Sequence, residues 1–200
     1  MKKGQRWLKS LAAAGLLIAG MGGCRAVRPP VQEVGHQPVL AENVYLANNI
    51  HYQRRIDYLE ASYANWTDVE PHHMLPVNTR VTVHDWWAGL GILVVEEERL
   101  PLILEYDHRR MRMSKREYVE EITRVEKIDL EALSEIDRQG IEEGQARIGM
   151  SKEGVRIALG YPARHETPTL QADTWTYWRD RWRRYNVIFD EDGLVKEIQD

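Results

Sequence analysis

The sequence predicts an α+β fold in which a β-rich first half precedes helices and three closing strands. Three observations support this prediction. Residues 79–106 contain short runs in which apolar and polar residues alternate with a period of two, as they do in strands. Residues 114–160 contain apolar residues at helical spacing, with capping residues beside them. Residues 174–198 return to alternating runs, separated by turn residues.

The β-rich half is expected to occupy residues 43–110 as a small antiparallel region. Three strands in sequence with short turns favour a meander that could close into an SH3-like barrel. Glycines at positions 89 and 91 are expected to interrupt the chain between the first two strands. Residues 50–66 fit either a helix or an edge strand with loops, and we favour strand and loop. The predicted strands are 79–85, 92–98 and 102–106.

Two helices are predicted after this region by their capping residues. Ser114 and Glu117 have the spacing of a capping box, which predicts a helix over residues 115–127. Ser134 is a suitable N-cap and Gly144 a suitable stop for a second helix between them. We expect the first helix to connect the β-rich region to a separate C-terminal domain.

A third short helix is predicted between residues 147 and 162, because both of its ends are marked. Ser151 is a suitable N-cap, since its hydroxyl can accept a hydrogen bond from an amide of the first turn. Met150 and Val155 are spaced as a hydrophobic staple. Gly160 can adopt the left-handed stop conformation, and a proline follows two residues later. Each cap contributes only about 1 kcal/mol, so this helix needs a sheet on which to pack.

This helix and the strands after it resemble the signature of the SmpA/OmlA domain, the domain of the small BamE-like lipoprotein in the outer-membrane β-barrel assembly machinery. The resemblance implies a BamE-like domain over residues 134–200, with two helices on a three-stranded antiparallel sheet. It also implies β-barrel assembly components as partners and the anionic phospholipid phosphatidylglycerol as a lipid ligand. The matching positions, which we interpret as structural, are Gly149, Met150, Ser151, Val155, Leu159, Gly160, Pro162, Trp175, Tyr177, Phe189 and Gly193.

The first 23 residues have the pattern of a secretory signal peptide, with a basic start, an apolar stretch over 11–18 and small residues at the end. The single cysteine, Cys24, follows in a motif that resembles a bacterial lipobox. We expect Cys24 to be acylated, with palmitate-type chains as the membrane anchor. By resemblance to enterobacterial lipoproteins, Arg25 favours the periplasmic face of the outer membrane. The predicted organisation is a signal peptide at 1–23, a flexible tether at 24–42, a β-rich domain at 43–110, a connecting helix at 111–133 and the SmpA/OmlA-like domain at 134–200.

Charge restricts the function classes. Removal of the signal peptide would leave 23 basic and 31 acidic residues, a net charge of −8. Such an acidic chain is a poor candidate for general nucleic-acid binding. It is equally unsuited to broad electrostatic adhesion to anionic lipid.

Candidate catalytic and metal-binding residues are few, and each has a simpler interpretation. His72 and His73 are adjacent, and no cysteine or histidine follows at the usual ligand spacing. Residues 190–193 resemble a fragment of a calcium loop but lack further ligands, so we expect a hairpin turn. Ser151 lacks the flanking pattern of a nucleophile elbow. We therefore predict no enzyme activity, no cofactor and no metal.

A basic and aromatic loop between two predicted strands is the strongest candidate for binding. Tryptophan and arginine dominate interface hot spots, which favours a contact surface. Alternatively, the loop is a solvated turn whose arginines pair with acidic residues of neighbouring helices. Trp86 and Trp87 could form a second contact patch, although we favour aromatic filling of a small core. The predicted contact loop comprises Trp178, Arg179, Arg181, Trp182, Arg183 and Arg184.

Together these patterns predict an outer-membrane lipoprotein without enzyme activity that serves as an accessory or scaffold in envelope assembly. It would bind protein partners, by resemblance the β-barrel assembly components. The alternative is a binding or inhibitor-type module that faces the periplasm and recognises a periplasmic enzyme or peptidoglycan.

Overall fold

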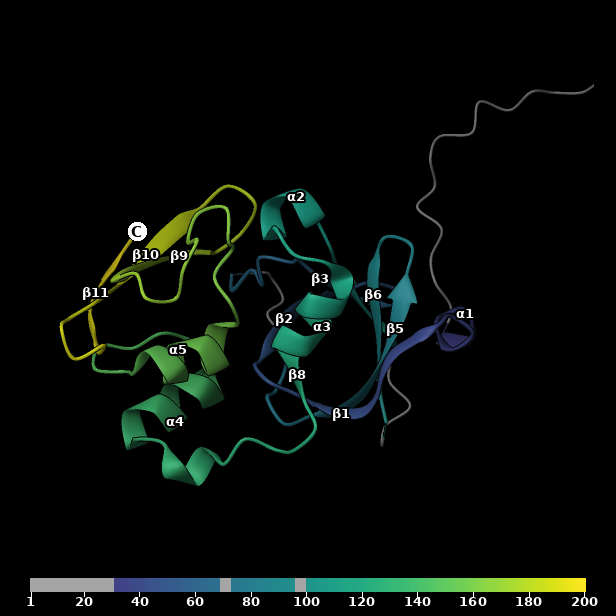
Figure 1. Cartoon of the computed structure of the whole chain (residues 1–200), viewed down its shortest axis with the longest axis horizontal. Helices are drawn as coiled ribbons and strands as arrows, with labels where there is room; N and C mark the ends of the chain where they lie inside the picture. Colours follow the sequence, from purple (N-terminus) through teal and green to yellow (C-terminus); the bar gives the residue numbers. More distant parts are fainter. Residues whose placement is uncertain (1–30, 69–72, 96–99) are drawn as a thin grey trace, which may run out of the picture.

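A computed structural model describes residues 31–68, 73–95 and 100–200. Over these residues an eight-stranded sheet is accompanied by a three-stranded sheet (Figure 1). The helices are α1 Val31–Gly35, α2 His108–Met111, α3 Lys115–Ile122, α4 Glu135–Glu143 and α5 Lys152–Leu159, with a 3-10 turn at Leu130–Ala132. The strands are β1 Val39–Leu46, β2 Ile50–Arg54, β3 Leu59–Ala61, β4 His73–Leu75, β5 Arg80–Trp86, β6 Gly89–Val94, β7 Leu102–Glu105, β8 Thr123–Arg124, β9 Thr174–Trp178, β10 Arg184–Phe189 and β11 Val195–Gln199.

The larger sheet is mixed and its strand order is not sequential. The order is β4-β2-β3-β7-β6-β5-β1-β8. β3 pairs with β7 in parallel, with Leu59 opposite Leu102, whereas the other neighbours pair antiparallel. β1 is the second strand from one edge of the sheet, where it pairs with β5 on one side and with β8 on the other.

The two faces of this sheet are covered by different helices. Leu102 and Leu104 of β7 point into the main core, where they pack with residues of α3 such as Val119. Ile103, between them, points to the opposite face and packs with Val34 of α1 and Trp86. Alternation with a period of two thus produces two apolar layers from one strand.

The smaller sheet, in the order β11-β10-β9, carries a second core together with α4 and α5. Trp175 and Phe189 pack edge to face on it, with ring centroids 4.8 Å apart. Ser134 and Ser151 cap the two helices as predicted, and both helices end at the predicted glycines. Figure 1 shows this group at one end of the molecule and the larger sheet with α1 at the other.

The predicted fold class is nevertheless wrong. The structure contains an eight-stranded mixed sheet where a small antiparallel meander was expected, and the C-terminal part is not a self-contained two-helix, three-strand BamE-like domain. The smaller sheet and its helices are joined to the larger sheet through buried polar residues. Asn49 donates to the carbonyl oxygens of Ile141 in α4 (2.7 Å) and Ala158 in α5 (3.3 Å). Asn65 donates to the carbonyl oxygen of Leu159 (2.7 Å).

Three smaller predictions also need correction. The tether predicted for residues 24–42 includes α1 and the start of β1, and Val34 within it is fully buried. The helix predicted over 115–127 ends at Ile122, because the chain continues there as β8, which pairs with β1; residues 125–127 lie in the loop that follows. The glycines at 89 and 91 lie inside β6 instead of interrupting the chain.

Candidate interaction site

Most of the signature positions lie in the core around α5 and the smaller sheet. Met150, Val155 and Leu159 are fully buried, and Trp175 and Tyr177 are 1% exposed. Ser151 acts as the N-cap of α5 by accepting a hydrogen bond from the Gly154 amide (3.0 Å). Phe189 lies in the same core, Pro162 is buried, and Gly149, Gly160 and Gly193 have positive φ, as their turns require.

A buried carboxylate, that of Asp137, connects helices α4 and α5. Asp137 accepts hydrogen bonds from the Ser134 hydroxyl (2.8 Å), the Ser151 amide (2.8 Å) and the Ser151 hydroxyl (3.1 Å). The same residue therefore fixes the first turns of two helices. The Ser151 hydroxyl is committed to this network and to the helix cap, which is a structural role.

The predicted contact loop, residues 178–184, divides into a paired part and an unpaired part. Three of its arginines form ion pairs: Arg179 with Asp200, Arg183 with Asp68 and Asp180, and Arg184 with Glu166. The carboxylates belong to loops and to the C-terminal residue, not to neighbouring helices as predicted. The Trp182 backbone amide and the Arg183 guanidinium hold the pKa of Asp180 below its usual range. These contacts fix the loop in one conformation.

The unpaired part consists of Arg181 and Trp182. Trp182 is 82% exposed, the second most exposed large apolar side chain in the described residues after Val125. The Arg181 guanidinium lies 5.9 Å from the Trp182 ring centroid and 6.0 Å from that of Trp66. Among the described residues Arg181 has no carboxylate within ion-pair distance, in contrast to the other arginines of the loop. Trp178, by comparison, is half-buried and packs against the main core, so it is not part of the exposed surface.

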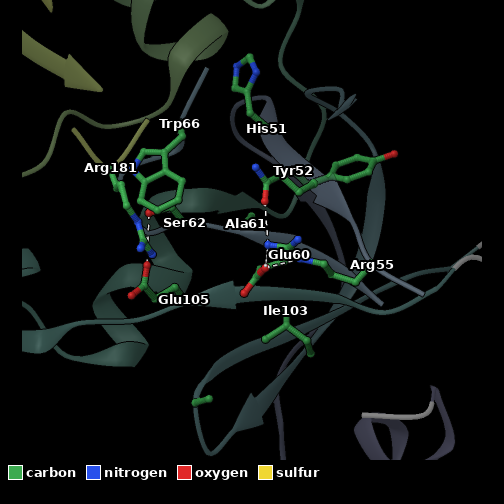
Figure 2. A pocket seen from close by; sticks show the side chains of 12 residues that line it. His51, Tyr52, Arg55, Glu60, Ala61, Ser62, Trp66, Ile103, Glu105 and Arg181 are labelled. Carbon is green, nitrogen blue, oxygen red and sulfur yellow. Dashed lines mark hydrogen bonds and ion pairs between the residues drawn. The ribbon is translucent and has the colours of Figure 1, made fainter. Parts of the chain in front are cut away.

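A cavity of about 350 Å³ lies beside Arg181, on the face of β2, β3 and β7 that points away from the main core (Figure 2). Figure 2 shows Ser62, Glu105 and Arg181 gathered at one end, with Trp66 beside them, and Arg55 with Glu60 at the other. The Ser62 hydroxyl donates to Glu105 (3.2 Å) and the Arg55 Nε donates to Glu60 (2.7 Å).

Sequence reasoning missed this cavity. The sequence pattern did not single out Trp66, and the two glutamates, Glu60 and Glu105, lie on strands too short to show alternation. Their distance along the chain hid the site, because Glu60 of β3 and Glu105 of β7 come to line one cavity only through the parallel pairing of the two strands. A signal that could have found them is a single glutamate in or at the end of a short apolar run, as in Leu59-Glu60-Ala61 and in Leu102 to Glu105.

The other residues considered for binding or metal coordination lie in different environments. Trp86 is 5% exposed and fills the small core beneath α1, whereas Trp87 is 75% exposed, so the prediction of core filling holds for only one of the pair. His72, like the signal peptide and Cys24, lies outside the described residues. His73 stacks on Tyr52 with ring centroids 5.5 Å apart. Within residues 31–68, 73–95 and 100–200, no three histidine, cysteine or acidic residues are grouped as metal ligands.

None of the helices in the described part of the chain is both long and apolar enough to span a bilayer. Comparisons with protein-family models, curated proteins and solved structures found no match to this chain. The function therefore has to be argued from the site itself.

Proposed function

We propose that this chain is a lipid-anchored protein of the bacterial outer membrane that has no enzyme activity and binds another envelope protein. The binding surface comprises Trp182 and Arg181, at the tip of the loop between β9 and β10. The observation that carries the proposal is a tryptophan that is 82% exposed beside an arginine without a carboxylate partner among the described residues.

Physical chemistry favours a protein partner at this surface. An exposed indole ring gains free energy when a partner covers it, and an unpaired guanidinium can form bidentate hydrogen bonds with a carboxylate. The ion pairs of Arg179, Arg183 and Arg184 hold the loop in place, so little conformational entropy is lost on binding. The partner surface should therefore offer an acidic side chain next to an apolar depression. The predicted partners, β-barrel assembly components, are candidates for it.

Photocrosslinking in intact cells tests the proposal. A photoreactive phenylalanine analogue at position 182 should give a discrete protein adduct, whereas the same probe at Ile148 should not. Ile148 is a suitable control because it is 55% exposed and lies before α5, away from the loop. Mass spectrometry of the adduct would identify the partner. Absence of an adduct at 182, identical adducts at both positions, or an adduct with phospholipid alone would contradict a protein contact.

The membrane anchor is tested separately. Replacement of Cys24 by serine should move the protein from the membrane fraction to the soluble periplasm, because acyl chains supply the anchoring free energy, about 0.8 kcal/mol per buried CH₂. Retention of Cys24→Ser in the membrane fraction would overturn the anchor and leave the contact surface to be judged by crosslinking.

A further inference from the structure

We infer that the cavity between Trp66 and Glu105 binds a neutral saccharide. This site adjoins the exposed Trp182 surface and shares Arg181 with it, but the inference does not depend on the proposed protein partner. The cavity volume, about 350 Å³, falls within the range of small-molecule sites and accommodates one or two sugar rings.

The charges that line the cavity are balanced, which favours a ligand without net charge. Two glutamates and two arginines line it, and Glu60 is already paired with Arg55 (2.6 Å). A strongly anionic ligand would meet the carboxylates of Glu60 and Glu105, and a strongly cationic one would meet both guanidinium groups. A neutral ligand avoids either repulsion and leaves the existing pair intact.

The polar groups of the wall suit hydroxyl groups in particular. A sugar hydroxyl both donates and accepts, so it needs a donor and an acceptor close together. Arg181 as donor and Glu105 as acceptor supply such a combination at one end, and Arg55 with Glu60 supplies a second at the other (Figure 2). Because Glu105 is already bonded to Ser62 and Glu60 to Arg55, the positions of both carboxylates are set before a ligand arrives, which lowers the entropic cost of binding.

Trp66 supplies the apolar surface that one face of a pyranose ring needs. The indole ring is part of the cavity wall, and its position is supported because it packs against the main core. The C–H groups of an equatorially substituted pyranose form a flat apolar face that can cover such a ring, while its hydroxyls point sideways to the polar wall. Ile103 and Ala61 add further apolar lining.

Isothermal titration calorimetry on the purified full-length lipoprotein, in a detergent without a sugar head group, tests this inference. Cellotriose and tri-N-acetylchitotriose are the probes, because both consist of flat β-1,4-linked pyranoses. We expect at least one to bind with a Kd of about 0.1–1 mM. Glu105→Gln should weaken binding about fivefold. Glu191→Gln, which removes the same charge from an exposed turn, should leave the Kd unchanged.

Trp66→Ala provides a second variant and should weaken binding about tenfold or more, provided that its circular dichroism spectrum matches that of the parent. The inference is overturned if neither sugar binds at about 20 mM, or if both variants bind as the parent does. Binding of adenosine monophosphate or of a free amino acid at the same residues, with no sugar binding, would also overturn it. Failure here leaves the crosslinking result at position 182 unaffected, so the two proposals are separable.

Discussion

The two sheets of this protein are organised in opposite ways. The smaller sheet and its helices use one continuous stretch, residues 134–200, and its strands pair with their neighbours in sequence. The larger sheet brings together strands from residue 39 to residue 124 in a non-sequential order that includes a parallel pair. The smaller sheet and its helices are specified largely by local sequence features, such as helix caps and turns. The larger sheet depends on contacts between distant residues, which leave little trace in a short window of sequence.

The regions are nevertheless not independent, because buried asparagines in the loops beside strands β2 and β3 of the larger sheet complete the ends of the helices that pack on the smaller one. The last carbonyl groups of a helix have no partner within it. Asn49 and Asn65 supply partners for α5, and Tyr177 donates to the Gly160 carbonyl (3.0 Å) from the smaller sheet. The first of four predictions tests how strongly this junction couples the two regions, and the other three test how packing, helix capping and charge differ between them.

The largest effect is expected from Asn49→Ala. The Asn49 side chain donates to the carbonyl oxygens of Ile141 and Ala158 and accepts from the Val77 amide (2.8 Å). Its loss removes three buried hydrogen bonds, which should lower the free energy of unfolding by about 3–5 kcal/mol. The Val77 amide loses its side-chain partner, whereas the Ile141 carbonyl keeps the Gly144 amide (3.2 Å) and the Ala158 carbonyl keeps His51 Nε2 (3.3 Å). Urea denaturation followed by circular dichroism measures this.

Asn186→Ala is the matched control for that variant. Asn186 lies within the smaller sheet and accepts one hydrogen bond from Thr176 (2.9 Å), so its loss should cost only about 1 kcal/mol. If the two asparagine variants lose equal stability, the junction does not couple the regions.

A methyl group added at a glycine should cost more stability between α4 and α5 than at the contact between β6 and α1. In Gly154→Ala the new Cβ would lie 2.0 Å from Asp137 Oδ1, and Asp137 is fixed by two serines. We expect a loss of about 2–3 kcal/mol. In Gly91→Ala the Cβ would lie 2.5 Å from Val34 Cγ1 on the five-residue helix α1, which can shift, so about 1 kcal/mol is expected. Chemical denaturation measures both losses, and a larger loss of stability in Gly91→Ala than in Gly154→Ala would contradict this prediction.

The two serine N-caps offer a smaller and more direct comparison. Ser151→Ala removes a helix cap and a hydrogen bond to buried Asp137, so we expect a loss of about 1.5–2 kcal/mol. Ser114→Ala removes an exposed capping box at α3, with an expected loss of about 0.5–1 kcal/mol. Thermal unfolding of the two variants in the same buffer measures the difference, and equal melting temperatures would argue against a special role for Asp137.

The smallest effect is a pH dependence at α3. Burial raises the pKa of Glu121 above its usual value of 4.5, although Arg164 opposes the shift. The folded state therefore binds this proton more tightly than the unfolded state, and stability contributed by the protonated form is lost as pH rises from 4.5 through the raised pKa. Glu121→Gln should remove this loss. Across that pH range, the unfolding free energy of Glu121→Gln should therefore decline less with pH than that of the parent. Glu120→Gln, a change at an exposed neighbour, is the control and should behave like the parent. Parallel pH profiles would refute the assignment.

Prediction from the sequence succeeded where a few adjacent residues suffice. The N-caps Ser114, Ser134 and Ser151 are confirmed, as is the turn at residues 190–193 between β10 and β11. Strand and loop, which we favoured for residues 50–66, are also confirmed. It failed for the two residues of β8, because so short a segment shows no periodicity and is a strand only through its partner.

For the same reason, the sequence predicted the contact loop but not the cavity beside it. The loop with Trp182 was visible as an unusual cluster of tryptophan and arginine in one stretch of chain. The sequence could not show that, among the described residues, Arg181 would be the one arginine of the loop without a carboxylate partner, since Asp68, Glu166 and Asp200 approach from distant positions. Nor could it show the cavity, whose walls come from residues 51 to 181.

By itself, the chain's order of residues determined the local elements: where three helices begin, where a hairpin turns, and which loop carries exposed aromatic and basic groups. Only the tertiary structure decided that Val34, in a segment expected to be a tether, is buried, that β3 meets β7 in parallel, and that buried asparagines join the two sheets. The physical reason is that caps and turns depend on neighbours along the chain. Burial, strand pairing and the satisfaction of buried polar groups depend on which distant segments meet.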